Sequence, residues 1–139
     1  MMTLIRLALC AAVFAATCFT LRADDAASLT SHLPPCGRVE VAVGKSGQFK
    51  PLPRPATEAL QGDWTHLTYS PGGTAGTPEY VVRFYSGKTL VGEEGISFAS
   101  STVTFIKSDK YPNISGTVAF DPASPRAQKL ESELKAYSK

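Results

Sequence analysis

Short runs in which apolar and polar residues alternate dominate the chain between residues 38 and 120. The clearest are R-V-E-V-A-V at residues 38–43 and E-Y-V-V-R-F-Y at residues 79–85, where every second residue is large and apolar. A repeat of two residues is typical of a β-strand with one buried face. Glycine and proline separate these runs, which indicates short turns between antiparallel strands.

Further strands are expected where β-branched and aromatic residues gather. Ser86-Gly87 supplies a two-residue turn between neighbouring strands, and Gly92-Glu93-Glu94-Gly95 is interpreted as a second turn with its two carboxylates in solvent. A bulge is expected near Ser100-Ser101, where the alternation loses phase. The strands predicted in addition to the first two lie at residues 64–69, 88–91, 96–107 and 114–120.

Two proline-rich segments interrupt this pattern. Pro51, Pro53 and Pro55 lack a backbone donor and fix φ, so this tract is predicted to be a stiff extended connector, followed by at most one helical turn at residues 57–60. Residues 70–78 contain three glycines and two prolines and are predicted to form an irregular loop. Loops of this length often carry function.

The C-terminal segment has a different periodicity. Ser124-Pro125 is a favourable helix start, and Ala127, Leu130, Leu134 and Tyr137 follow at helical spacing. The predicted fold class is therefore α+β, mainly β. It consists of an antiparallel meander sheet or small open barrel of five to six strands, with one C-terminal amphipathic helix at residues 125–137.

The N-terminus has the layout of a secretory signal. Arg6 precedes an apolar run at residues 7–19, and a small residue, Ala23, ends the segment. We expect residues 1–23 to be a cleaved signal peptide, residues 24–37 a flexible arm and residues 38–139 one β-rich domain. The mature chain would then be secreted or periplasmic, without a transmembrane helix. The alternative is lipoprotein processing at Cys18, which would anchor the chain to a membrane.

The charge balance argues against a nucleic-acid partner. Of the 14 Lys and Arg residues, Arg6 and Arg22 lie in the predicted leader, which leaves twelve basic residues against twelve acidic ones. Nucleic-acid binding usually needs a basic face, and this composition does not predict one. Asn113-Ile114-Ser115 matches the N-glycosylation pattern, which only a eukaryotic secretory pathway would use.

Cys36 is the only cysteine that remains once the leader is removed, so an internal disulfide is excluded. Its thiol either packs as a small apolar group or forms an intermolecular disulfide in a homodimer. A third reading pairs it with His66 as a catalytic nucleophile. Two histidines without metal-ligand spacing predict no metal site and no cofactor.

Gly62-Asp63-Trp64, followed by strands, resembles the G-x-W opening of lipocalin-like and other calycin β-barrels. The resemblance implies a truncated barrel or open curved sheet with Trp64 at its closed end, and a small apolar ligand. It also implies that Arg126 takes the place of the barrel-closing arginine, although that residue falls in the predicted helix.

These observations predict a non-enzymatic, exported binding module. The sheet face that carries Trp64, His66, Tyr80 and Phe84 is expected to hold a small apolar ligand or a protein partner. The alternative is an interaction or inhibitor-like protein that acts through an exposed loop or edge strand, with a Cys36-linked homodimer as one form.

Overall fold

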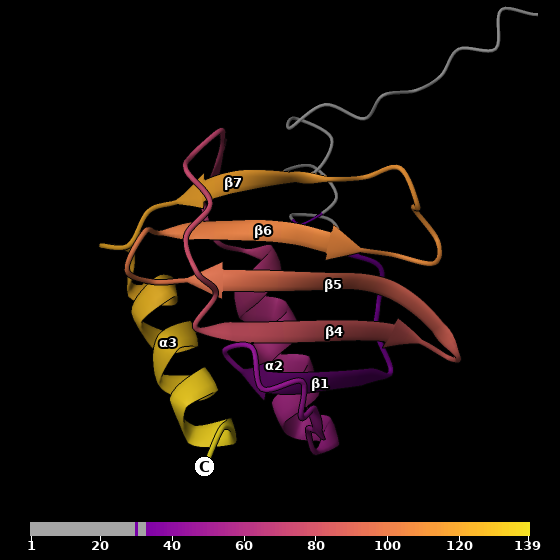
Figure 1. Cartoon of the computed structure of the whole chain (residues 1–139). Coiled ribbons are helices and arrows are strands. Elements are labelled where there is room, and N and C mark those ends of the chain that lie inside the picture. The colour runs from indigo at the N-terminus through magenta and orange to yellow at the C-terminus, as the bar shows by residue number, and fades with distance from the viewer. Residues whose placement is uncertain (1–29, 31–32) are drawn as a thin grey trace, which may run out of the picture.

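Seven antiparallel strands form one open sheet in the computed structural model, which describes residue 30 and residues 33–139 (Figure 1). The strands lie in the order β2-β1-β4-β5-β6-β7-β3. The predicted class, α+β and mainly β, is confirmed. The strands are β1 (Arg38–Val43), β2 (Lys50–Pro51), β3 (Tyr69–Pro71), β4 (Tyr80–Ser86), β5 (Thr89–Ser97), β6 (Thr102–Lys107) and β7 (Gly116–Phe120).

The central strands β4 to β7 form the predicted meander, but β5 is longer than expected. The predicted turn at residues 92–95 is wrong, because these residues lie within β5 and pair with neighbouring strands. Neither Gly92 nor Gly95 has a positive φ. Gly95 serves close packing instead, because a Cβ on it would lie 2.7 Å from Pro78 Cγ. A Cβ on Gly92 would lie 3.5 Å from Phe105, which is an ordinary contact distance. The chain turns at residues 98–101, where the sequence predicts a bulge.

Within residues 33–139, two helices accompany the sheet. The C-terminal helix α3 (Pro125–Tyr137) begins and ends as predicted, and Ser124 Oγ accepts a hydrogen bond from the Ala127 N–H at its start. The helix α2 (Arg54–Thr65) contradicts three predictions: the extended proline connector through Pro55, the limit of one helical turn at residues 57–60, and the strand at residues 64–69. Pro55 lies in the first helical turn, where no N–H is needed, so proline starts this helix rather than preventing it.

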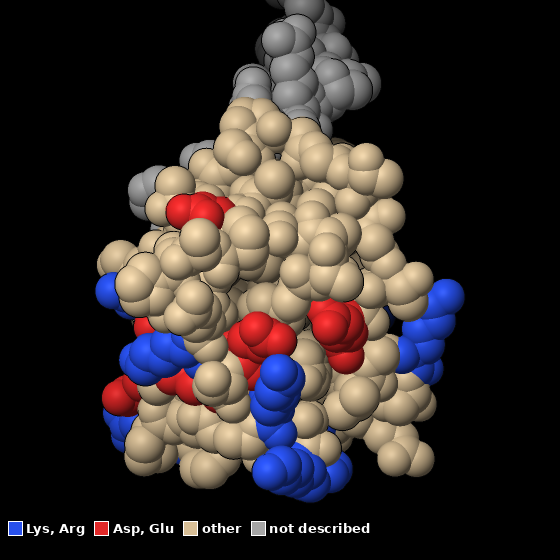
Figure 2. Space-filling view, turned by 90° about the vertical axis from the view of Figure 1, so that its left-hand side faces the viewer, with Lys and Arg blue, Asp and Glu red and all other residues tan. Residues whose placement is uncertain are grey.

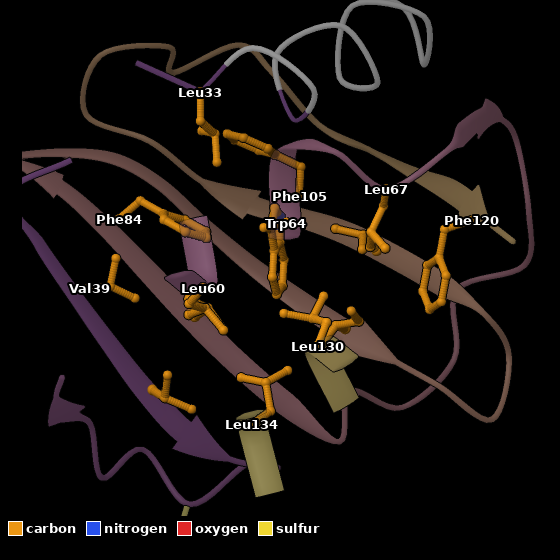
Figure 3. Close-up of a cluster of buried hydrophobic side chains, with 14 of the residues drawn as sticks. Leu33, Val39, Leu60, Trp64, Leu67, Phe84, Phe105, Phe120, Leu130 and Leu134 are labelled. Carbon is orange, nitrogen blue, oxygen red and sulfur yellow. The ribbon is translucent and has the colours of Figure 1, made fainter. Parts of the chain in front are cut away.

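The apolar core lies between the helices and one face of the sheet, which we call the inner face. Both helices lie behind the sheet in Figure 1, and Leu60 and Trp64 of α2 point into the core beside Leu130 and Leu134 of α3 (Figure 3). Val82 and Phe84 meet them from β4 and are fully buried, which confirms the predicted alternation along that strand.

The opposite face of the sheet, the outer face, is crossed by residues 72–78, which we call the strap. The strap connects β3, at one edge, to β4 and therefore passes the ends of β7, β6 and β5 (Figure 1). A Cβ on Gly73 would lie 3.1 Å from Thr102 and 3.5 Å from Ala119, and Pro78 touches Gly95. The strap is thus packed on the sheet.

The described part of the predicted arm also packs on the core. Thr30 and Leu33 are buried, and so is Cys36. The predicted leader, residues 1–23 with Cys18, lies outside the described residues. Among the residues described, no helix is both long and apolar enough to cross a bilayer.

Candidate functional site

A groove of about 530 Å³ lies between the start of α2 and the segment that leads into β1. A second hollow of about 310 Å³ adjoins it farther along α2, and both share Pro35, Glu58 and Gln61. The groove is lined by Pro35, Cys36, Gly37, Leu52, Arg54, Thr57, Glu58 and Gln61.

Gln61 fixes the wall of the groove. Its Oε1 accepts a hydrogen bond from the Cys36 N–H at 3.1 Å, and its Nε2 donates to the Pro34 carbonyl oxygen at 2.8 Å. One amide side chain therefore pairs with two backbone groups of the facing segment, as a neighbouring strand would. Because proline at positions 34 and 35 limits the conformations of that segment, the wall is held in one position.

The groove combines an apolar part with a charged rim. Pro35 and Leu52 supply apolar surface, while Arg54 and Glu58 form an exposed i,i+4 ion pair at 3.3 Å. Such an exposed pair contributes at most about 0.5 kcal/mol, so its members can be redirected to a ligand at little cost. The chemistry suits a small molecule with an apolar body and one polar or charged group.

The thiol of Cys36 also lines the groove, but it is held in its protonated form. Its Sγ donates to the Pro34 carbonyl oxygen at 3.1 Å. Burial, together with the nearby Glu94 carboxyl, raises the pKa of Cys36 to about 11. Nucleophilic cysteines need the opposite shift, since the thiolate is the reactive form.

Beneath this segment lies a buried carboxyl group that the sequence did not indicate. Glu94 is fully buried on the inner face, where Trp64 Nε1 donates to Oε2 at 2.6 Å and Thr30 Oγ1 donates to Oε1 at 2.7 Å (Figure 3 shows Trp64). Burial raises the pKa of Glu94 to about 7, although both hydrogen bonds favour the charged form. The carboxyl joins β5, α2 and the N-terminal segment.

The interpretation of Glu94 as a solvated turn residue is therefore wrong. Two signals could have identified its position. Alternation read through residues 92–97 places Glu94 on the same side as Ile96, and a buried tryptophan requires an acceptor for its indole N–H. Burial and the Glu94 carboxyl also raise the pKa of Tyr69 well above its ordinary value. The Tyr69 hydroxyl donates to the Trp64 carbonyl oxygen at 2.7 Å.

The four predicted ligand-binding residues do not lie at one site. Trp64 and Phe84 are fully buried and pack edge to face, with ring centroids 5.4 Å apart. Tyr80 is partly buried against Phe98 at a centroid distance of 6.4 Å. His66 is exposed at the end of α2, where its Nδ1 lies 2.7 Å from the Gly62 carbonyl oxygen. None of the four lines the groove.

A polar cluster links the two helices. The buried Asp63 carboxylate accepts from Arg126 at 3.1 Å and lies 3.1 Å from Lys129 Nζ. Burial and Asp63 together raise the pKa of Glu133 to about 7, against the opposing effect of Lys129. In the described part of the chain, no three His, Cys, Asp or Glu side chains gather as a metal site would require.

The sheet is open, in agreement with the open curved sheet that the resemblance implies. The positions of the motif residues differ from those implied. Gly62, Asp63 and Trp64 lie within α2 rather than at the start of a strand, and Arg126 binds Asp63. On the side of the molecule drawn in Figure 2, acidic and basic side chains are interspersed.

Comparison with models of protein families, with curated proteins and with solved structures found no match.

Proposed function

We propose that this chain is a non-enzymatic binding protein of the periplasm or extracellular space, which holds a small, mainly apolar ligand in the groove beside α2. The volume of that groove, about 530 Å³, carries the proposal. It lies within the range of about 300 to 1,000 Å³ typical of ligand sites. The site differs from the sheet face expected from sequence, because α2 and α3 cover that face.

The residues around the groove support binding rather than catalysis. The wall is fixed by Gln61 before a ligand arrives, which lowers the entropy lost on binding. The protonated Cys36 thiol offers a weakly polar surface rather than a nucleophile. Arg54 and Glu58 can each turn toward a polar group of the ligand.

Two glycines allow the groove to be tested by filling it. Gly37 lines the groove, and a Cβ on it would meet no atom within 4 Å. Gly62 lines only the smaller adjoining hollow and is equally open. Neither has a positive φ. Gly37→Trp should therefore occupy the groove without straining the backbone, and Gly62→Trp is the matched control.

The assay is titration of the mature protein with N-phenyl-1-naphthylamine, an apolar dye whose fluorescence rises on binding. We expect saturable binding by the wild type and Gly62→Trp, and affinity at least about tenfold lower for Gly37→Trp, equal to about 1.4 kcal/mol. Native mass spectrometry of the purified protein would reveal a retained ligand. Equal affinity in all three proteins, or no saturable binding by the wild type, would contradict the proposal.

The alternative, an interaction protein acting through an edge strand or loop, has less support. The edge strands β2 and β3 contain two and three residues, and each ends in proline. Short edges that carry proline are poor templates for another strand. The strap packs on the outer face through Gly73 and Pro78, while Thr74, Ala75 and Thr77 stay exposed and offer no large apolar side chain.

A further inference from the structure

Four charged side chains of alternating sign cross the outer face on four adjacent strands. Strand pairing places Glu40 of β1 opposite Arg83 of β4, Arg83 opposite Glu93 of β5, and Glu93 opposite Lys107 of β6. We call this row the charge ladder. Read across the sheet, its signs are minus, plus, minus, plus.

Contacts within the chain use only part of the ladder's bonding capacity. Arg83 Nε donates to Glu93 Oε2 at 2.7 Å, and Lys107 Nζ lies 3.8 Å from the same oxygen. Glu40 pairs at 3.4 Å with Arg38, on its own strand, rather than with the arginine opposite. The Lys107 side chain is 57% exposed. The two ends of the ladder therefore hold charges that can bind a further partner.

The order of the signs is complementary to itself. A twofold axis parallel to the strands, between β4 and β5, brings a second copy face to face with the strand order reversed. Glu40 then faces Lys107 of the other copy, so both ends of the ladder meet the opposite charge. Arg83 and Glu93 are also in opposite register, but Glu93 is buried and the Phe49 ring covers Arg83, so the end pairs make the contacts between copies. A twofold axis across the strands would place like charges together, so the pattern also selects one orientation.

Aromatic and apolar side chains surround the ladder. The Phe49 ring lies over Arg83, with its centroid 3.6 Å from the guanidinium carbon, and Arg38 lies 4.0 Å from the centroid of Tyr85. Ile106 is 44% exposed and lies on the same face, beside Gly95. Aromatic residues and arginine are enriched in protein interfaces. The strap covers only the other end of the face.

We propose that the outer face binds a second copy of this chain through the charge ladder. The two sheets lie face to face, with the strands of the two copies parallel to one another. Four strands about 4.8 Å apart and about six residues long span about 400 Å², which is an upper limit because β5 is already buried on this face. This is at most about half the area that a standard interface buries on each partner, so we expect a weak dimer that salt dissociates. The proposal does not depend on the groove, which lies beside α2.

Charge reversal tests the pairing directly. Glu40→Lys places two lysines together at both ends of the dimer, and Lys107→Glu places two glutamates there, so each variant alone should be monomeric. An equal mixture should form a heterodimer. At one end, the lysine introduced at position 40 faces the glutamate introduced at position 107, and at the other end the native Lys107 faces the native Glu40. A like-charge contact that a reversal creates within its own chain would persist in the mixture. Recovery of a dimer on mixing therefore reports on the contacts between the two copies.

The measurement is sedimentation velocity over a concentration series, at low and at high salt, with reductant present so that Cys36 cannot form a disulfide. We expect a wild-type dimer that weakens at least about tenfold in high salt. Circular dichroism checks that each variant is folded, and Glu40→Gln with Lys107→Gln provides a milder pair that should also weaken association. A monomeric wild type at the highest concentration, dimeric single variants, or a mixture that stays monomeric would overturn the proposal.

Discussion

Replacing Glu94 with glutamine should remove a pH dependence of stability that the native fold builds in. The carboxyl is fully buried, and its pKa rises from 4.5 to about 7. A group whose pKa is higher in the folded state stabilises the fold below its unfolded pKa, and this contribution is lost as pH rises through the folded value. The wild type should therefore lose stability between about pH 4.5 and pH 7.

The size of the effect follows from the shift. Each pKa unit corresponds to about 1.4 kcal/mol, so the change from 4.5 to about 7 amounts to a loss on the order of 3 kcal/mol between acidic and mildly alkaline pH. Glutamine carries no charge at either pH. Its carbonyl oxygen can still accept from Trp64 Nε1, and its amide can donate to the Thr30 hydroxyl.

The assay measures the free energy of unfolding of both proteins in urea at about pH 4 and at about pH 8. For each protein, the difference between these two free energies is then calculated. Comparing this difference between the proteins cancels any constant effect of the substitution and the contribution of Glu133, whose pKa is also raised. The wild type should lose on the order of 3 kcal/mol more than Glu94→Gln. If both proteins changed equally with pH, the reasoning about burial would be refuted.

Three further outcomes are expected from the same structure. Trp64→Phe keeps an aromatic ring against Phe84 but removes one donor from Glu94, so urea unfolding should show a loss of about 1 to 3 kcal/mol that is larger at high pH. Gly95→Ala should destabilise the chain, because the new Cβ would lie 2.7 Å from Pro78. Gly62→Ala, whose Cβ would meet nothing within 4 Å, should stabilise α2 by up to about 1 kcal/mol. Thermal unfolding should show a lower midpoint for Gly95→Ala and a higher one for Gly62→Ala. Iodoacetamide should alkylate Cys36 at least about a hundredfold more slowly than free cysteine, because the pKa of Cys36 is about 11; mass spectrometry measures the rate. A rate equal to that of free cysteine would show that the thiol is not held protonated.

Alternation and turn residues were sufficient to predict β1, β4, β6 and β7, because a strand with one covered face imposes its period on the sequence. The helix α3 was equally predictable, since Ser124 and Pro125 mark its start and Leu130 and Leu134 mark its buried side. Local patterns failed where tertiary packing decides the outcome. Gly95 resembles a turn residue, but it is glycine because Pro78, from the strap, touches it.

The site was less predictable than the fold for a related reason. Its walls come from residues distant in sequence, and the groove exists only after Gln61 meets Cys36. Trp64 was expected to contact a ligand from a sheet face, yet it lies on α2 and its indole N–H is used by Glu94. No local pattern links these residues, since the pairings depend on how α2 lies against the sheet.

The start of α2 determines both the buried Trp64–Glu94 pair and the groove. With Pro53 preceding the first turn, the helix places Leu60 and Trp64 one turn apart on the core side, where Trp64 reaches Glu94. Gln61 lies about 100° around the helix from Leu60, which directs it toward the Pro34–Cys36 segment instead. A helix shifted by one residue in register would turn both side chains from their partners. The groove wall and the Trp64–Glu94 bond are therefore expected to form together or not at all.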